Sequence, residues 1–241
     1  MRLDKYLAQS GLGTRSEVKT LIKQKRVTVN DARVLTSNFQ VDVNADAVAF
    51  DGVLVQHQTL FYYMMNKPAG TVSVTKDNVH KTVLELLSAA DFRADIFPAG
   101  RLDKDTEGLL LLTNDGDLAH AVLSPHKHVE KEYFARISGR VTQKTRTQFH
   151  DGVTLHGEKG NPFTGALTLV SADEDAETSE IRLVIHRGVY HQVKRMFKAV
   201  GMEVTSLKRL RMGSLQLDET LAPGHYRALT ADEIDSLKNI R

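Results

Sequence analysis

The stretch Gly100-Arg101-Leu102-Asp103-Lys104-Asp105-Thr106-Glu107-Gly108-Leu109 runs directly into the apolar segment 109–113. The apolar segment predicts a buried strand, and the glycines and charged residues before it predict a turn. Such a turn carries charged side chains to the mouth of a core, where their pKa values can be tuned for chemistry. From these residues alone, an exposed charged loop is the alternative interpretation.

More strands than helices are predicted around this stretch. Apolar residues at helical spacing predict a helix over residues 191–200, and the capping box Thr230-Ala231-Asp232-Glu233 opens another. Asp117 is expected to cap a helix over residues 118–123, and a short helix is expected near residues 82–89. The predicted strands cover residues 61–65, 109–113, 133–137, 166–170 and 181–185. Many strands with few helices indicate an α+β fold with a largely antiparallel sheet.

The N-terminal segment predicts a separate helix–helix–hairpin module. A helix over residues 2–10 is followed by a second one that opens at the capping box Thr14-Arg15-Ser16-Glu17. Two hairpins follow, one joining Val27-Thr28-Val29 to Val34-Leu35 through Asn30-Asp31 and the other turning at Asp51-Gly52.

A polar segment, Gln56-His57-Gln58-Thr59, is typical of a linker. We therefore expect an N-terminal module over residues 1–58 and a larger α+β domain over residues 59–241.

The composition excludes several classes of protein. The chain has 241 residues and no cysteine, which rules out disulfides, iron–sulfur clusters, thiolate zinc sites and cysteine nucleophiles. No apolar run approaches the roughly 20 residues that span a bilayer, and the N-terminus lacks a signal-peptide pattern, so a cytosolic protein without a membrane partner is expected. Two histidine pairs, His126 with His128 and His186 with His191, lack an acidic partner, and no nucleotide-binding fingerprint is found. We predict no metal and no nucleotide cofactor.

Basic residues gather in two islands of a nearly neutral chain, which has 32 basic and 30 acidic residues. Residues 1–30 hold seven basic and two acidic side chains, and residues 187–211 hold seven basic and one acidic side chain. Two such islands indicate patches for a polyanion. Solvated helix faces are the alternative interpretation.

Several motifs, in the same order, resemble the bacterial ribosomal RNA pseudouridine synthases of the RsuA family. The motifs are Met1-Arg2-Leu3-Asp4-Lys5-Tyr6-Leu7, Asn66-Lys67-Pro68-Ala69-Gly70, the stretch 99–109, Lys131-Glu132-Tyr133, Tyr190-His191-Gln192-Val193-Lys194-Arg195-Met196-Phe197 and Leu221-Ala222-Pro223-Gly224-His225-Tyr226-Arg227. The resemblance implies an S4-like RNA-binding domain followed by a pseudouridine synthase catalytic domain.

The resemblance also implies roles for individual residues. Asp103 matches the catalytic aspartate, Lys194 the basic residue that pairs with it and lowers its pKa, and Tyr133 the active-site tyrosine. Arg101 matches the arginine that occupies the gap left when the target nucleotide flips out. Further expected RNA contacts are Lys67, Arg187 and Arg195 in the catalytic domain and Arg15, Lys19, Lys23 and Arg26 in the N-terminal module.

One position departs from the family pattern, which commonly has Glu-Gly-Arg before Tyr-His-Gln. This chain has Arg187-Gly188-Val189, so valine stands where the family commonly has arginine, and Arg187 is the arginine nearest in sequence. The reaction implied is an isomerisation without redox change or hydrolysis, and it requires no cofactor.

The implied substrate is small-subunit (16S) ribosomal RNA, with uridine 516 as the target, taken as free RNA or as an assembly intermediate by a monomeric enzyme. A uridine of large-subunit (23S) RNA is an alternative. A non-catalytic RNA-binding protein of ribosome assembly is another, but it would not need a carboxylate at Asp103. A glycosidase using Asp103 and Asp105 is disfavoured because sugar-stacking tryptophan is absent.

Overall fold

The computed structural model describes residues 1–55, 59–158, 160–173, 175 and 177–239. The chain forms two compact units, Met1–Leu60 and Phe61–Arg241, each with its own hydrophobic core. Apart from Thr59, the segment expected to be a linker lies outside the described residues. In the described part of the chain, no helix has the length and apolar character needed to cross a membrane.

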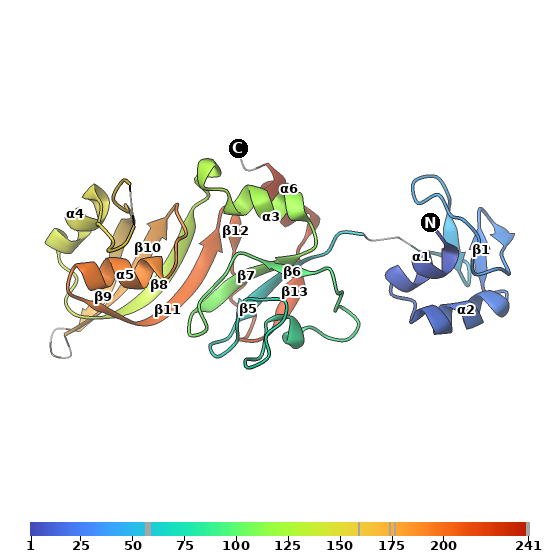
Figure 1. Cartoon of the computed structure of the whole chain (residues 1–241), viewed down its shortest axis with the longest axis horizontal. Coiled ribbons are helices and arrows are strands. Elements are labelled where there is room, and N and C mark those ends of the chain that lie inside the picture. Colours follow the sequence, from blue (N-terminus) through green and yellow to red (C-terminus); the bar gives the residue numbers. More distant parts are fainter. Residues whose placement is uncertain (56–58, 159, 174, 176, 240–241) are drawn as a thin grey trace. The chain divides into compact units, whose positions relative to one another are not determined.

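The smaller unit combines two helices with a four-stranded antiparallel sheet (Figure 1). As predicted, Thr14 and Glu17 form a capping box: the Thr14 hydroxyl accepts from the Glu17 N–H, and the Glu17 carboxylate accepts from the Thr14 N–H at 2.6 Å. The elements are α1 (Leu3–Gln9), α2 (Arg15–Lys23), β1 (Val27–Val29), β2 (Ala32–Arg33), β3 (Val48–Phe50) and β4 (Val53–Leu54), with the sheet order β2-β1-β3-β4.

The first hairpin of this unit turns where predicted but pairs different residues. Asn30 and Asp31 both have positive φ, 51° and 63°, as a two-residue hairpin turn requires. The tight turn pairs Val29 with Ala32, so the second strand is β2 and the prediction of Val34-Leu35 is wrong.

The larger unit is built on a nine-stranded mixed sheet, in which β7 and β11 are paired in parallel and the other described strand pairs are antiparallel. The main order is β13-β5-β7-β11-β8-β10-β9, with β12 beside β11 and β6 beside β7. This arrangement confirms the predicted α+β class. The strands are β5 (Tyr62–Lys67), β6 (Phe97–Ala99), β7 (Glu107–Thr113), β8 (Lys131–Ser138), β9 (Ala166–Asp173), β10 (Thr178–Ile185), β11 (Glu203–Met212), β12 (Leu215–Gln216) and β13 (Tyr226–Ala228).

Helices cover both faces of this sheet, which explains why β7 is apolar at every central position. Leu110 and Leu112 belong to the core shared with α4 and α5, whereas Leu109 and Leu111 belong to the core shared with α3 and α6. Figure 1 shows α4 and α5 against the half of the sheet formed by β8 to β11, and α3 and α6 beside β12. The helices are α3 (Gly116–Leu123), α4 (Gln143–Asp151), α5 (Gln192–Ala199) and α6 (Ala231–Lys238), with single 3₁₀ turns at η1 (Leu84–Leu86) and η2 (Pro125–Lys127).

Two local predictions for this unit are wrong. The helix expected near residues 82–89 is only the 3₁₀ turn η1. The cap of α3 is Asp115 rather than Asp117, because the Asp115 carboxylate accepts from the Leu118 N–H at 3.0 Å. The capping box at Thr230 is confirmed at the start of α6.

Candidate active site

The loop between β6 and β7 carries Asp103 and is fixed by the chain that follows β5. The Gly70 N–H donates to the Lys104 carbonyl at 2.7 Å. The Ser73 hydroxyl donates to the Leu102 carbonyl at 3.1 Å and accepts from the Leu102 N–H at 3.2 Å. These bonds hold the backbone on both sides of Asp103, so its carboxylate projects from a rigid loop.

Lys67, at the end of β5, is a second anchor of this loop. Its side chain is fully buried, and Nζ donates to the carbonyls of Pro68 at 3.0 Å, Lys104 at 3.3 Å and Thr106 at 2.8 Å. Burial lowers the pKa of Lys67 to about 8, although nearby carboxylates oppose the shift. The predicted RNA contact of Lys67 is wrong, because no part of its side chain is exposed.

Glycine is required where the loop enters β7. Gly108 has φ +99°, and a Cβ atom there would lie 2.2 Å from the carbonyl oxygen of Arg209. The close parallel pairing of β7 with β11 therefore depends on the missing side chain of Gly108.

The carboxylate of Asp103 faces two nitrogen groups from α5 and the residue before it. Lys194 Nζ lies 3.4 Å from Asp103 Oδ2, and His191 Nε2 lies 3.4 Å from Asp103 Oδ1. Lys194 Nζ is closer to Asp105 Oδ1, at 2.6 Å. Lys194 is thus shared between the two carboxylates.

The neighbouring charges shift the pKa values of Lys194 and Asp105. Burial lowers the pKa of Lys194, but its hydrogen bond to Asp105 and the charge of Asp103 outweigh that effect and raise the pKa overall. The hydrogen bond from Lys194 holds the pKa of Asp105 below its ordinary value. His191 adopts the left-handed conformation, with φ 49°, and stacks on Tyr190 with ring centroids 3.7 Å apart.

Asp103, His191 and Lys194 line a cavity of about 750 Å³ in the larger unit. Asp103 is about one quarter exposed, so a substrate in the cavity can reach its carboxylate. The side chains around the cavity that could take part in chemistry or recognition include Arg101, Asp103, Lys104, Lys131, Tyr133, Tyr190, His191, Gln192, Lys194 and Arg209.

Strand geometry brings three of these residues together. Lys131 and Tyr133 lie two apart on β8, so they share one face of the sheet. Arg209 is the direct partner of Tyr133 on the neighbouring strand β11, and directly opposite residues point to the same face. The sequence interpretation missed Lys131 and Arg209 as site residues. Side chains two apart on a strand share one face, and this alternation could have indicated Lys131 from the position of Tyr133. The pairing of Arg209 with Tyr133 joins distant parts of the chain and cannot be predicted from local sequence.

The sequence-predicted RNA contacts of the larger unit are only partly brought together. Arg101 is exposed at the cavity and, among the described residues, makes no hydrogen bond or ion pair. Arg187 lies away from the cavity lining, with its guanidinium 4.0 Å from the Phe163 ring centroid. Val189, at the position of the family arginine, lines the cavity.

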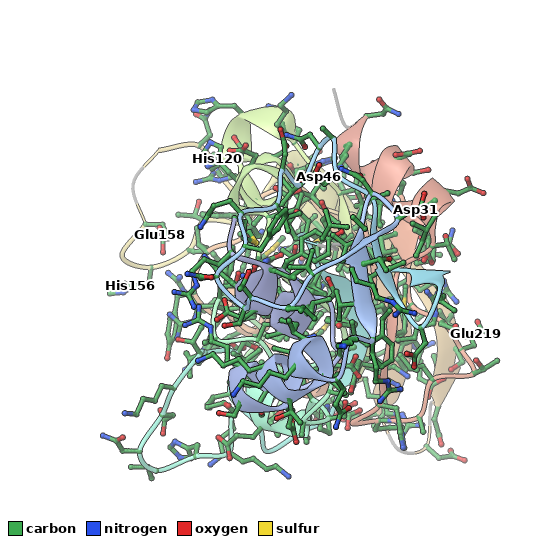
Figure 2. All side chains as sticks on the ribbon, turned by 90° about the vertical axis from the view of Figure 1, so that its right-hand side faces the viewer. Asp31, Asp46, His120, His156, Glu158 and Glu219 are labelled. Atoms are coloured by element: carbon green, nitrogen blue, oxygen red, sulfur yellow. The ribbon has the colours of Figure 1, made fainter. Side chains whose placement is uncertain are left out.

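Arg195 is bound to a neighbouring loop instead of the cavity. Its Nη1 lies 2.8 Å from Glu158 Oε1, and its Nη2 donates to the His156 carbonyl at 2.8 Å; Figure 2 labels both loop residues. The basic residues of the second island are therefore divided: Arg209 is buried, Arg195 and Arg211 form ion pairs, and Lys198 is exposed.

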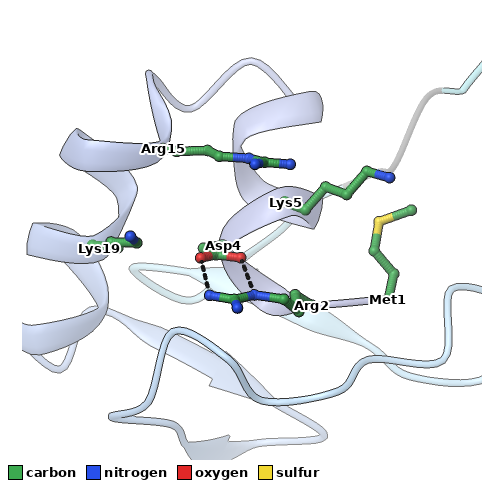
Figure 3. A pocket seen from close by; sticks show the side chains of 6 residues that line it. All are labelled: Met1, Arg2, Asp4, Lys5, Arg15 and Lys19. Carbon is green, nitrogen blue, oxygen red and sulfur yellow. Dashed lines mark hydrogen bonds and ion pairs between the residues drawn. The ribbon is translucent and has the colours of Figure 1, made fainter.

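A separate hollow of about 490 Å³ lies on the smaller unit between α1 and α2. Figure 3 shows Arg15 extending from α2 and Lys5 from α1, with Arg2 hydrogen-bonded to Asp4 below them. Lys19 also lines the hollow. Of the four predicted contacts of this unit, the hollow therefore brings together Arg15 and Lys19.

The other two predicted contacts of the smaller unit lie outside that hollow. Lys23 is exposed at the end of α2. Arg26 is engaged by an ion pair with Asp51, and its guanidinium lies 4.5 Å from the Phe50 ring centroid. A phosphate would have to compete with Asp51 for Arg26.

Among the described residues, no three or more histidine, aspartate or glutamate side chains are grouped so that they could hold a metal ion.

Comparisons with known proteins agree with this architecture. Residues 61–199 match the RNA pseudouridylate synthase family, and residues 1–46 match the S4 domain. The chain is 45% identical to an uncharacterized RNA pseudouridine synthase, YtzG, of Bacillus subtilis, over 98% of both chains. It is 43% identical to ribosomal small subunit pseudouridine synthase A of Escherichia coli, over 98% of this chain and 100% of that protein. A crystal structure of a pseudouridylate synthase, 35% identical, superimposes with a TM-score of 0.65 and covers 98% of this chain and 99% of that one.

The fold, the cavity beside Asp103 and these matches define an RNA-modifying isomerase with an attached S4 domain. The chain belongs to the RNA pseudouridine synthase family, and its similarity to ribosomal small subunit pseudouridine synthase A (RsuA) extends over nearly its full length.

Proposed function

We propose that this enzyme converts one uridine of small-subunit ribosomal RNA to pseudouridine, and that the target is uridine 516 of 16S RNA. The observation that carries the proposal is the rigid loop that presents Asp103 to a substrate-sized cavity with Lys194 Nζ 3.4 Å away. The 43% identity to small subunit pseudouridine synthase A favours this substrate over large-subunit RNA.

Asp103 acts as the ionised nucleophile in this proposal. A stacked base exposes neither its glycosidic bond nor its C5 edge to a carboxylate, so the nucleotide must flip into the cavity. Arg101, exposed at the cavity and without a protein partner among the described residues, fills the gap in the RNA stack. Lys194 stabilises the charge of Asp103, and Tyr133 contacts the base and assists removal of the C5 proton.

The smaller unit holds the RNA by its phosphates in the same proposal. Arg15 and Lys19 supply positive charge at the hollow beside α1, and Lys23 extends the basic surface of α2. The enzyme acts as a monomer in the cytoplasm, on free ribosomal RNA or an assembly intermediate, and needs no cofactor because the product is an isomer of the substrate.

Position-resolved mapping of pseudouridine in ribosomal RNA tests this proposal in cells with and without the gene. We expect one small-subunit site to disappear on deletion and to return with the wild-type gene but not with Asp103→Asn. The amide is nearly isosteric but cannot act as an anionic nucleophile, so RNA affinity should stay within a few-fold. Loss of a large-subunit site would overturn the substrate assignment, and rescue by Asp103→Asn would overturn the role of the carboxylate.

A further inference from the structure

Two cations are buried in the cavity wall and have no carboxylate partner among the described residues. Arg209 is 2% exposed and Lys131 is 6% exposed. Arg209 Nε donates to the Leu109 carbonyl at 2.8 Å, and Lys131 Nζ donates to the Val129 carbonyl at 3.0 Å. Arg209 Nη2 is buried and has no hydrogen-bond partner in the described part of the protein. Burying charge in this way is costly unless something else compensates it.

A neighbouring arginine shows what ordinary pairing looks like on the same strand. Arg211 lies two residues further along β11 and forms ion pairs with Glu130 at 2.8 Å and Glu132 at 3.1 Å. A β-bulge between Arg209 and Arg211 places Arg211 opposite Glu132, away from the cavity. The two arginines therefore lie on the same strand in different environments. Arg211 forms two ion pairs, whereas Arg209 forms none with the described residues.

We propose that Arg209, assisted by Lys131, binds the oxygens of the target uracil and stabilises the negative charge that develops there during isomerisation. This inference rests on the proposed function. Both cations line the same cavity as Asp103 and share the sheet face of Tyr133, so they meet the base that Tyr133 contacts. A preorganised cation in a dry site is well suited to stabilise charge that appears only in the transition state.

The electron count of the reaction explains why such a group is needed. When the N1–C1′ bond breaks, its electron pair stays on the base, whose N1, O2 and O4 share the charge. The Asp103 carboxylate donates an electron pair to C1′ and leaves again when C5 bonds to C1′. The C5 proton then departs and N1 gains a proton, so the sum is an isomerisation. Between these steps the free base is an anion, and Arg209 Nη2 is an unused donor for it.

The depth of the two cations favours the base over a phosphate as their ligand. A flipped nucleotide remains joined to the RNA chain outside, so its phosphates stay near the mouth of the cavity, where Arg101 and Lys104 are exposed. The base is the part that reaches buried groups such as Arg209 and Lys131. Burial lowers the pKa of Lys131 to about 8, and the charge of Arg209 adds to the shift, so Lys131 remains mostly charged at neutral pH.

Single-turnover kinetics with saturating enzyme test the inference. The substrate is a 16S transcript carrying uridine tritiated at C5, and tritium release reports the chemical step. We expect Arg209→Gln to slow this step by about 100-fold or more, as for loss of one oxyanion donor, while RNA affinity stays within threefold. Arg209→Lys should retain more activity than Arg209→Gln because it keeps the charge. Lys131→Gln should be slowed at least about tenfold.

Arg211→Gln is the matched control, because it removes the same side chain from the same strand outside the cavity. Its rate should stay within threefold of wild type. Thermal unfolding of every variant checks the fold, and Lys131→Gln supplies the test if Arg209→Gln does not fold.

Three results would overturn the inference. The first is a near-wild-type rate in folded Arg209→Gln and Lys131→Gln. The second is an equal loss in Arg209→Lys and Arg209→Gln, which would assign the effect to the bond with the Leu109 carbonyl. The third is weakened RNA binding at an unchanged saturating rate, which would indicate a phosphate ligand. Failure of the proposed function looks different, because wild-type enzyme itself would then release no tritium from this RNA.

Discussion

Replacing Lys67 by methionine should separate the stability of the fold from the precision of the active site. The substitution keeps the length of the buried side chain but removes the ammonium group that joins three carbonyls around the Asp103 loop. Two of those carbonyls keep another donor: Thr71 Oγ1 donates to Pro68 at 3.1 Å, and the Gly70 N–H donates to Lys104 at 2.7 Å. The Thr106 carbonyl loses the bond from Lys67.

The expected change in stability is small because two terms oppose each other. An unpaired buried carbonyl costs about 1–3 kcal/mol, and each weakened acceptor costs about 0.5–1.5 kcal/mol. Against this, the pKa of Lys67 falls from 10.5 to about 8 on folding, so its charged form destabilises the native state by about 3 kcal/mol near neutral pH. Lys67→Met removes that penalty. The net change in unfolding free energy should therefore be within about 2 kcal/mol, or a few degrees in melting temperature.

The pH dependence of the unfolding free energy tests the pKa shift of Lys67, because the direction of the change can be predicted. Between about pH 8 and 10.5 the unfolded chain binds more protons at Lys67 than the folded chain does, so stability rises with pH. From pH 7.5 to 9.5 we expect wild type to gain about 2 kcal/mol relative to Lys67→Met. The measurement should stay below pH 10, because burial raises the pKa of Tyr63 to about 12 and deprotonation of that residue in the unfolded chain reverses the slope.

The catalytic effect of Lys67→Met should be much larger than its effect on stability. A displacement of Asp103 by about 1 Å can cost 10²-fold in rate, and Lys67 is one of the anchors of its loop. We expect the single-turnover rate to fall about 100-fold with RNA affinity unchanged, whereas the exposed Lys198→Met should behave as wild type. A rate within threefold of wild type would refute the view that Lys67 positions the loop. So would a rate loss that simply follows unfolding of the protein.

Other substitutions test the remaining parts of the site and the fold. Lys194→Met should slow the chemical step about 10- to 100-fold, and Asp105→Asn less than threefold, if the shared lysine acts mainly on the nucleophile; equal losses would assign the main role to Asp105. Gly108→Ala should destabilise the protein by about 3–5 kcal/mol in urea unfolding, since its Cβ atom would meet the backbone of β11. Gly116→Ala, with open space around it, should stay within about 1 kcal/mol. Deleting residues 1–58 should leave a folded catalytic unit that binds small-subunit RNA more weakly and with a shallower salt dependence; an identical slope would mean that the module does not hold RNA.

The features predicted correctly from the sequence are those formed by residues only a few positions apart. The capping boxes at Thr14 and Thr230 were predicted correctly because each bond joins residues three positions apart. The turn at Asn30 was also correct, but its partner strand was wrong because the tight turn fixes the register at the very next residues.

The strand β11 was missed because its sequence, Glu203–Met212, mixes charged and apolar residues without clear alternation. It lies inside the sheet between β7 and β8, and its bulges change which residues face each side. Lys67 was misassigned for a related reason. A lysine is ordinarily exposed, and nothing in the local sequence indicates that two carbonyls of the Asp103 loop, those of Lys104 and Thr106, will accept hydrogen bonds from its ammonium group.

The parallel contact between β7 and β11 links the fold to the chemistry proposed for the cavity. Gly108 allows the two backbones to approach, and the Arg209 side chain then reaches back to the Leu109 carbonyl. The two strands thus fix Arg209 in the cavity wall, and β7 directly follows the loop that carries Asp103. A substitution at this contact should therefore displace both Arg209, which we propose binds the base, and the nucleophile Asp103. Activity should be lost at smaller displacements than those that unfold the sheet. That coupling makes Gly108 a requirement of the site as much as of the fold.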